Sequence, residues 1–256
     1  MRAAIAAIFL FLVPSQAFAW GQTGHRVTGA IAQDYLSPRA ARAVRAIIGT
    51  ETLAEASTWA DEMRSDPGPF WQRTAGPFHY VTVPPGKTYA EVGAPPEGDA
   101  VTALDRFAET LRDPDASLED KQLALRFTVH IIGDLHMPLH VGNGEDRGGN
   151  DVHVSFFGSS TNLHAVWDSG MIDRRGLSYT ELSAFLARRI TPALRRAWSE
   201  PNPLVWIAES AAIRDTIYPE DTTISWGYAY LNAPVVDERL EQAGVRIAAY
   251  LNDLFG

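Results

Sequence analysis

Two pairs of histidine and aspartate, each four residues apart, are the strongest chemical signal in this sequence. His130 and Asp134 lie in an apolar segment, and His164 and Asp168 repeat the spacing. In an α-helix, residues i and i+4 lie on the same face, so each pair directs two side chains toward one point. Imidazole nitrogens and carboxylate oxygens form a typical ligand set for zinc. The spacing therefore predicts a metal site.

A third histidine, His140, follows the first pair. Pro138 must end the helix after Asp134, because proline lacks an N–H and clashes with the preceding turn. His140 then projects from the next turn and is free to face a different metal ion from His130. Each of these residues has a plainer alternative, as a surface side chain or a hydrogen-bonded core group, and Asp168 also has the alternative of a helix cap.

The first 19 residues have the pattern of a secretory signal. Arg2 precedes an apolar stretch from Ala3 to Val13, and an Ala-x-Ala site ends at Ala19. A membrane anchor is the alternative, but a spanning helix needs about 20 apolar residues. Cleavage after Ala19 leaves residues 20–256 as one domain. It also gives Trp20 a free α-amine, which can bind metal.

Composition narrows the class of protein. The chain is 46% hydrophobic and 21% charged, as in ordinary globular proteins, and it has no cysteine. Its stability must therefore come from the core and from metal ions rather than from disulfides. The net charge of −9 excludes a general basic groove for a polyanion, although bound divalent cations reverse the sign locally. We expect an exported, periplasmic or extracellular monomer with no stable membrane association.

Apolar residues recur mostly at spacings of three and four, which predicts a mainly α, single compact domain with a small β-hairpin. The expected helices are Thr23–Tyr35, Pro38–Ile48, Ala54–Arg64, Ala100–Arg112, Leu118–Leu135, Tyr179–Ala197, Pro203–Ile217 and Val235–Leu254. The expected extended segments are Phe78–Val83 and Val152–Phe157.

The chemically active residues fall into motifs that share one order along the chain. These motifs are Trp20-Gly-x-x-Gly-His25, Trp59-Ala-Asp61-x-x-Arg64, Phe78-His79-Tyr80, His130-x-x-Gly-Asp134-x-His-x-Pro-Leu-His140, Gly148-Gly-Asn150 and Asn162-Leu-His164-x-x-Trp-Asp168. In sequence and order they resemble the S1/P1 nuclease family, and the resemblance covers nearly all of residues 20–256. It implies a helical fold of the phospholipase C/P1 nuclease type that holds three zinc ions.

The resemblance also assigns the zinc ligands. Asp61, His79, His130 and Asp134 would hold the first ion. The amine and carbonyl of Trp20 would join His25 and Asp134 on the second, so that Asp134 bridges the two. His140, His164 and Asp168 would hold the third. The family pattern does not use His136 and His153 as ligands, and we assign them roles in supporting the structure or the ligands.

The activity implied by the resemblance is hydrolysis of single-stranded DNA and RNA by a zinc-bridging hydroxide. The products carry 5′-phosphates, and mononucleotides are substrates of a 3′-nucleotidase activity. Arg64 and Asp134 are the expected catalytic residues. Tyr80, Lys87 and Asn150 are expected to bind substrate. Each role has a plainer alternative. Arg64 could be a surface arginine, Tyr80 a core residue, Lys87 a solvated lysine, and Asn150 part of a plain turn.

Two features set limits on the resemblance, and two other functions compete with it. Relatives often carry an acidic residue where this chain has Thr82, and fungal and plant members usually have disulfides, whereas this chain has none.

A zinc-dependent phospholipase C is the main enzymatic alternative. The short gap from Trp20 to His25 stands against it, and so does Asp168, where that family uses a glutamate. A non-catalytic zinc-binding module is the other alternative, and a closed metal site would need neither Arg64 nor Tyr80.

Overall fold

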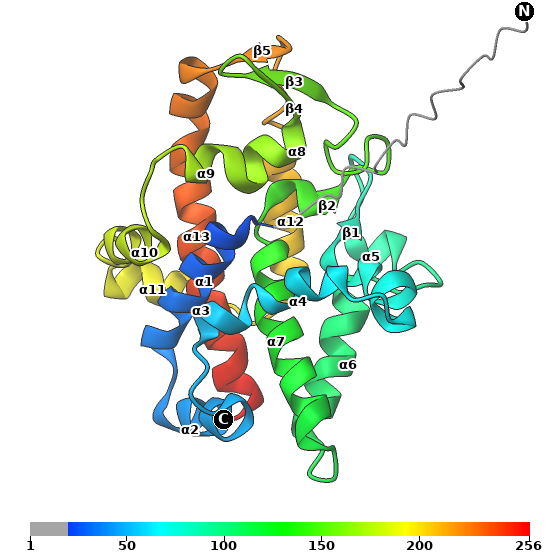
Figure 1. Ribbon diagram of the computed structural model, residues 1–256, viewed down its shortest axis with the longest axis vertical. Helices are drawn as coiled ribbons and strands as arrows, with labels where there is room; N and C mark the ends of the chain where they lie inside the picture. The colour runs from blue at the N-terminus through cyan, green and yellow to red at the C-terminus, as the bar shows by residue number, and fades with distance from the viewer. Residues whose placement is uncertain (1–19) are drawn as a thin grey trace, which may run out of the picture.

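Four of the longer helices form the centre of the protein. The computed structural model describes residues 20–256, so the predicted signal at residues 1–19 lies outside the described residues. Helix α7 (Leu118–Asp134) lies in the middle of the molecule, with α1 (Gln22–Tyr35) and α13 (Trp226–Leu254) on one side and α6 (Ala100–Arg112) on the other (Figure 1). The prediction of a mainly helical domain is confirmed.

Helix α7 is fixed by its ends and by its apolar second half. The Ser117 hydroxyl accepts from the backbone N–H of Asp120, and Glu119 and Asp120 lie in the positive first turn. Every residue from Phe127 to Asp134 is buried, so the end of this helix is enclosed on all sides. The carboxyl end of α7 therefore carries its polar side chains into the interior.

Shorter helices surround this centre. They are α2 (Pro38–Ile48), α3 (Leu53–Ala56), α4 (Trp59–Glu62), α5 (Tyr89–Val92), α8 (Leu163–Ala165), α9 (Met171–Asp173), α10 (Tyr179–Ala187), α11 (Pro192–Trp198) and α12 (Pro203–Arg214). Tighter or wider helical turns are η1 (Met63–Ser65), η2 (Phe70–Thr74), η3 (Gly76–His79), η4 (Pro138–His140) and η5 (Val166–Gly170). No helix among residues 20–256 has the length and apolar character that crossing a membrane requires.

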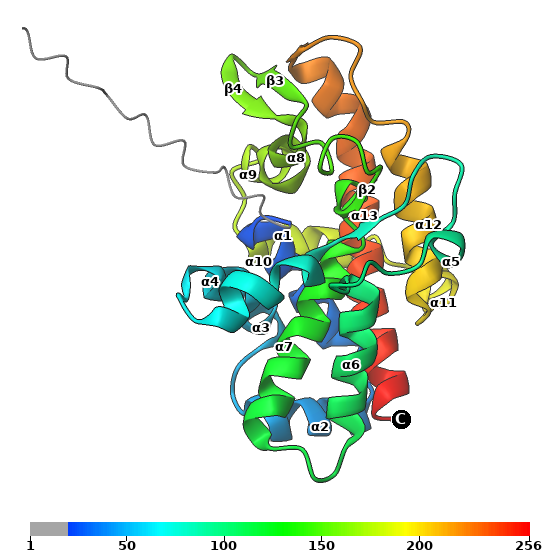
Figure 2. The ribbon, with the colours of Figure 1, turned by 90° about the vertical axis from the view of Figure 1, so that its right-hand side faces the viewer.

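Two small sheets complete the fold. Strands β1 (Val81–Thr82) and β2 (Val141–Gly142) pair in parallel. Strands β3 (His153–Phe156) and β4 (Ser159–Asn162) form the predicted hairpin, which projects at one end of the molecule (Figure 2). A strand that was not predicted, β5 (Thr223–Ile224), adds to β3 in parallel.

The prediction of one helix over Ala54–Arg64 is wrong, because the chain breaks after α3. The Ser57 and Thr58 hydroxyls donate to the carbonyls of Ala54 and Glu55, and such local bonds compete with a continuous helix. The predicted helix Tyr179–Ala197 is likewise two helices. Pro192 begins the second, because the residue before a proline avoids the helical conformation.

Two further boundaries differ from prediction. The predicted strand Phe78–Val83 shortens to β1, because Pro77 starts the helical turn η3. Helix α13 begins at Trp226 instead of Val235 and runs through Pro234. Proline removes one helical hydrogen bond, to the carbonyl of Tyr230, but this residue is exposed and water can hydrate the carbonyl.

Glycines allow α1 to approach its neighbours closely. A Cβ atom at Gly244 of α13 would lie 2.5 Å from Cγ2 of Ile31, and a Cβ atom at Gly29 of α1 would lie 2.3 Å from the carbonyl oxygen of Leu53. Both distances are shorter than any van der Waals contact. The packing of α1 between α13 and α3 therefore requires residues without side chains at these two positions.

Substitution Gly244→Ala is expected to destabilise the protein by about 1–3 kcal/mol, because the added methyl group overlaps Ile31. Gly227→Ala in the same helix is the matched control, since nothing lies within 4 Å of its Cβ position. Urea unfolding of both variants measures the difference. Equal stability of the Gly244→Ala and Gly227→Ala variants would show that α1 and α13 do not pack as closely at Gly244 as described.

Candidate metal centre and active site

Histidine and aspartate side chains meet in three buried groups. Within each group the ligand atoms lie within 4.8 Å of one another. The groups are His25, His130 and Asp134; Asp61, His79 and His130; and His140, His164 and Asp168. Eight residues that the sequence singled out as ligands are thus brought together from α1, α4, η3, α7, η4, α8 and η5.

The ligand atoms around His79 are close enough to share one metal ion. His79 Nδ1 lies 2.8 Å from His130 Nε2 and 3.2 Å from Asp134 Oδ2. Asp61 Oδ1 lies 3.9 Å from His79 Nδ1 and 3.8 Å from His130 Nε2. A tetrahedron with zinc–ligand distances of about 2.0–2.1 Å has edges of about 3.3 Å. Asp61, His79 and His130 therefore form a group that could hold one metal ion, and Asp134 lies next to its two histidines.

The carboxylate of Asp134 faces two sides. Its Oδ2 lies 3.1 Å from His130 Nε2 and 3.2 Å from His79 Nδ1. Its Oδ1 lies 3.2 Å from His25 Nε2 and 3.9 Å from His140 Nδ1. Because each oxygen has its own histidine neighbours, this carboxylate has the geometry to bridge two cations.

Backbone carbonyls orient three of the histidines. Nδ1 of His130 donates to the carbonyl of Ser57 at 2.7 Å. Nδ1 of His140 donates to the carbonyl of His79 at 2.5 Å, and Nδ1 of His164 donates to the carbonyl of Gly148 at 2.7 Å. A hydrogen on Nδ1 leaves Nε2 without one and able to bind a cation. The fold therefore fixes both the tautomer and the direction of these ligands.

Two glycines make room for the imidazoles. A Cβ atom at Gly133 would lie 3.0 Å from Nδ1 of His25. Gly148 has φ +63°, and its Cβ would lie 2.3 Å from the carbonyl oxygen of Leu139. Gly148 is therefore held in the conformation that offers its carbonyl to His164.

Burial leaves the carboxylates in need of cations. It raises the pKa of Asp134 to about 7 and that of Asp168 well above the usual range, and it lowers the pKa values of His25 and His79. Buried oxygens Oδ1 of Asp134 and Asp168 form no hydrogen bond with the described residues. His130 differs, because the lowering effect of burial is outweighed by the charges of Asp134 and Asp61, which raise its pKa to about 9. The neutral imidazoles of His25 and His79 and the two unpaired Oδ1 atoms suit divalent cations, which relieve the cost of burial.

Trp20 lies beside these groups. The side chain of Trp20 is completely buried, and a Cβ atom added at Gly24 would lie 3.1 Å from the Cβ of Trp20. The next residue, Gly21, donates its N–H to the carbonyl of Asp168 at 2.9 Å. This bond holds the first residues of the domain against the third group.

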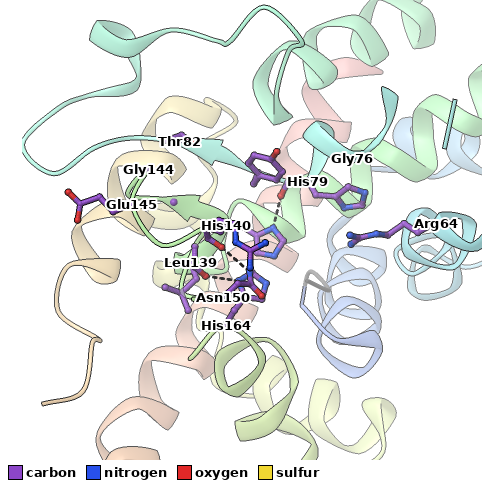
Figure 3. A pocket seen from close by; sticks show the side chains of 14 residues that line it. Arg64, Gly76, His79, Thr82, Leu139, His140, Gly144, Glu145, Asn150 and His164 are labelled. Atoms are coloured by element: carbon purple, nitrogen blue, oxygen red, sulfur yellow. Dashed lines mark hydrogen bonds between the residues drawn. The ribbon is translucent and has the colours of Figure 1, made fainter. Parts of the chain in front are cut away.

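A cavity of about 400 Å³ opens on His79, His140 and His164, which belong to two of the three His/Asp groups. Arg64 enters it from one side, and Thr82 and Glu145 lie on the other (Figure 3). Arg64 Nη1 also contacts Asp61 Oδ1 at 3.4 Å. The cavity therefore joins the metal groups to an outer surface.

Of the three residues predicted to bind substrate, two line this cavity and one does not. Tyr80, which is 48% exposed, and Asn150 both line it. Asn150 is held by a hydrogen bond from its Nδ2 to the carbonyl of Arg147. The cavity lining does not include Lys87, which is exposed in the turn after Pro84.

Sequence reasoning missed Glu145 and Arg147 as lining residues, noted Thr82 only as a departure from relatives, and set two histidines aside. The glycines around residues 142–150 indicated only a loop. Nδ1 of His136 donates to the carbonyl of Ile132, and its Nε2 faces Arg246 at 3.1 Å, whereas His153 is exposed on β3. Neither histidine belongs to a metal-binding group among the described residues.

Comparisons with known proteins agree with this site. The family described as S1/P1 Nuclease matches residues 20–256. The chain is 31% identical to Endonuclease 4 of Arabidopsis thaliana, over 93% of this chain and 90% of that protein. It is 30% identical to Nuclease S1 of Aspergillus oryzae, over 92% of this chain and 91% of that protein. It is 34% identical to Nuclease P1 of Penicillium citrinum, over 59% and 58% of the two chains. A match of this extent, with the His and Asp motifs gathered at one cavity, shows that the chain belongs to the S1/P1 nuclease family.

Proposed function

We propose that this protein is a zinc-dependent endonuclease that hydrolyses single-stranded DNA and RNA to 5′-phosphorylated products and also acts as a 3′-nucleotidase. The observation that carries the proposal is the meeting of three His/Asp groups beside one open cavity. A closed storage site would have no such opening onto its ligands. Membership of a nuclease family favours a phosphodiester over a phospholipid substrate.

The proposed ligands are those that the family resemblance implies, and the grouping of eight His and Asp residues supports them. Asp61, His79, His130 and Asp134 hold one zinc ion, and Asp134 also faces a second ion held by His25 and by the amine and carbonyl of Trp20. His140, His164 and Asp168 hold a third. The donor set of imidazoles and carboxylates is the one that zinc prefers. Bound zinc supplies an activated water near neutral pH and neutralises charge on the phosphate.

Residues of the cavity complete the chemistry. Arg64 reaches the cavity beside Asp61, where its guanidinium donates to phosphoryl oxygens as negative charge builds on them. The exposed ring of Tyr80 stacks on a base, a contact worth about 1–3 kcal/mol for any base. Asn150, fixed by its bond to Arg147, offers its side chain at the cavity wall. Lys87 lies outside the cavity lining and contacts only more distant parts of a strand.

Stacking on Tyr80 explains a preference for unpaired strands. A base inside a duplex has no exposed face, whereas a base of a single strand can lie flat on the ring.

The domain has no helix that could span a membrane among residues 20–256. Together with the signal pattern of residues 1–19, this supports an exported monomer that acts in the periplasm or outside the cell.

A substrate panel tests the proposed reaction. Purified protein is expected to hydrolyse single-stranded DNA, RNA and 3′-AMP, and to lose this activity in a chelator and regain it with zinc. Product analysis should find 5′-phosphate ends. Hydrolysis of phosphatidylcholine without nucleotide turnover would instead show a phospholipase, and turnover of neither substrate would favour a zinc-binding module.

Asp134→Asn tests the bridging carboxylate. The expected result is fewer than three zinc ions per chain, together with a fall in kcat/KM of at least about 1,000-fold, because metal stabilisation of charge is worth several kcal/mol. His153→Ala is the control, since this histidine is exposed and belongs to no metal-binding group among the described residues. Metal analysis that finds three zinc ions in Asp134→Asn would contradict the bridging role.

An N-terminal extension tests the role of Trp20. The nitrogen of Trp20 is an α-amine only in a chain that begins at Trp20. One extra residue before it turns this nitrogen into a peptide amide, which binds zinc poorly. A variant with one alanine before Trp20 is expected to bind one zinc ion fewer or more weakly. Extension after Gly256 is the control. Equal zinc content and affinity in both would remove the amine from the ligand set.

A further inference from the structure

The cavity wall beside the metal groups carries both a flat ring and a carboxylate. Tyr80, which follows η3, has extended backbone angles, and β1 continues directly after it. Alternate side chains of an extended segment point to the same side, and Tyr80 and Thr82 are both exposed while Val81 between them is buried. Tyr80 and Thr82 therefore belong to one face of the cavity.

Glu145 adjoins this face from the neighbouring strand. Thr82 pairs with Gly142 in the parallel sheet, and a Cβ atom at Gly144 would lie 3.3 Å from Cγ2 of Thr82. The next residue, Glu145, lines the same cavity, and Figure 3 shows it on the Thr82 side, opposite Arg64. A nucleotide with its phosphate at Arg64 and its base on Tyr80 would thus have the edge of the base toward Glu145.

The loop that carries Glu145 is held in one shape. Asn143 Oδ1 accepts from the backbone N–H groups of Glu145 and Asp146, at 2.8 and 3.2 Å. The two carboxylate oxygens of Asp146 accept from the Tyr218 hydroxyl at 2.6 Å and from the Gly149 N–H at 2.9 Å. These bonds fix the backbone of the loop, so that binding needs to order only the side chain of Glu145.

The carboxylate of Glu145 is available for a ligand. Among the described residues, none forms a hydrogen bond or ion pair with it. The nearby guanidinium of Arg147 is already held by Asp151, through Nε at 3.1 Å and Nη2 at 2.7 Å. Glu145 is therefore better placed than Arg147 to read a base.

We propose that Glu145 is a specificity-determining residue that reads the Watson–Crick edge of the base stacked on Tyr80 and favours guanine. This inference rests on the proposed nuclease function. Guanine presents two adjacent donors, N1–H and the N2 amino group, to the two oxygens of a carboxylate, which makes a charge-assisted bidentate pair. Adenine and cytosine place one ring acceptor beside one amino group, and uracil has one donor between two carbonyls. A carboxylate repels those acceptors.

The test compares 3′-GMP, 3′-AMP, 3′-CMP and 3′-UMP as substrates of the zinc-loaded enzyme. The expected wild-type preference for 3′-GMP over 3′-UMP in kcat/KM is about tenfold or more, the usual discrimination of a bidentate contact. In Glu145→Gln this ratio is expected to fall to about two or less, through a higher KM for 3′-GMP and, because the repulsion of the uracil carbonyls is lost, a lower KM for 3′-UMP, while kcat for both substrates changes little.

Glu97→Gln is the matched control. The pKa of the Tyr80 hydroxyl is raised by burial first and by the charge of Glu97 second, so this carboxylate is also close to the ring. It does not line the cavity, and its loss is expected to leave the base preference intact. The two variants remove the same charge from the same neighbourhood.

Three results would overturn the role of Glu145: no base preference in the wild type, an unchanged preference in Glu145→Gln, or an equal loss with all four bases. Calorimetric binding of guanosine and uridine measures the same preference without turnover. If no nucleic acid or nucleotide is hydrolysed, the proposed function fails, and the binding ratio still decides whether Glu145 selects guanine.

Discussion

The burial of several carboxylates among histidines is the constraint on which the rest of this structure depends. Asp134 is completely buried, and histidines approach both of its oxygens. Asp61 and Asp168 are also buried close by, and their negative charges would repel one another in a medium of low dielectric constant. Protonation or compensating cations must relieve this repulsion, so the stability of the fold is coupled to the occupancy of the candidate metal groups.

The backbone around the site serves this constraint. The break between α3 and α4, which interrupts an expected helix, places the Ser57 carbonyl where it accepts from His130. The left-handed conformation of Gly148 has the same result for His164. Irregular backbone is therefore concentrated where carbonyls must orient imidazoles, and glycines bring α1 close enough for His25 to join them.

The cavity resolves a conflict between the charge of the protein and that of its proposed substrate. A chain with a net charge of −9 repels a polyanion at long range. Cations at the three groups, together with Arg64, would reverse the sign at the place where a phosphate would lie. Glu145 on the opposite side adds negative charge where the proposed ligand presents a base edge rather than a phosphate.

The local rules of sequence predicted much of the helical framework and failed where tertiary contacts decide. Helix boundaries such as Pro38–Ile48 and Ala100–Arg112 follow from caps and apolar spacing, which are local properties. The course of α13 through Pro234 and the addition of β5 to β3 depend on neighbours distant in the sequence. Periodicity contains no information about such neighbours.

The sequence by itself determined the chemical types of the candidate ligands and their order, because donor chemistry belongs to each side chain. It also separated His140 from His130, because Pro138 has no N–H to donate to the carbonyl of Asp134 and so does not extend the helix. Only the tertiary structure decided that each Asp134 oxygen faces different histidines, that Lys87 lies away from the cavity and that Glu145 lines it. Those facts depend on the packing of segments far apart in the chain, which spacing along the sequence does not contain.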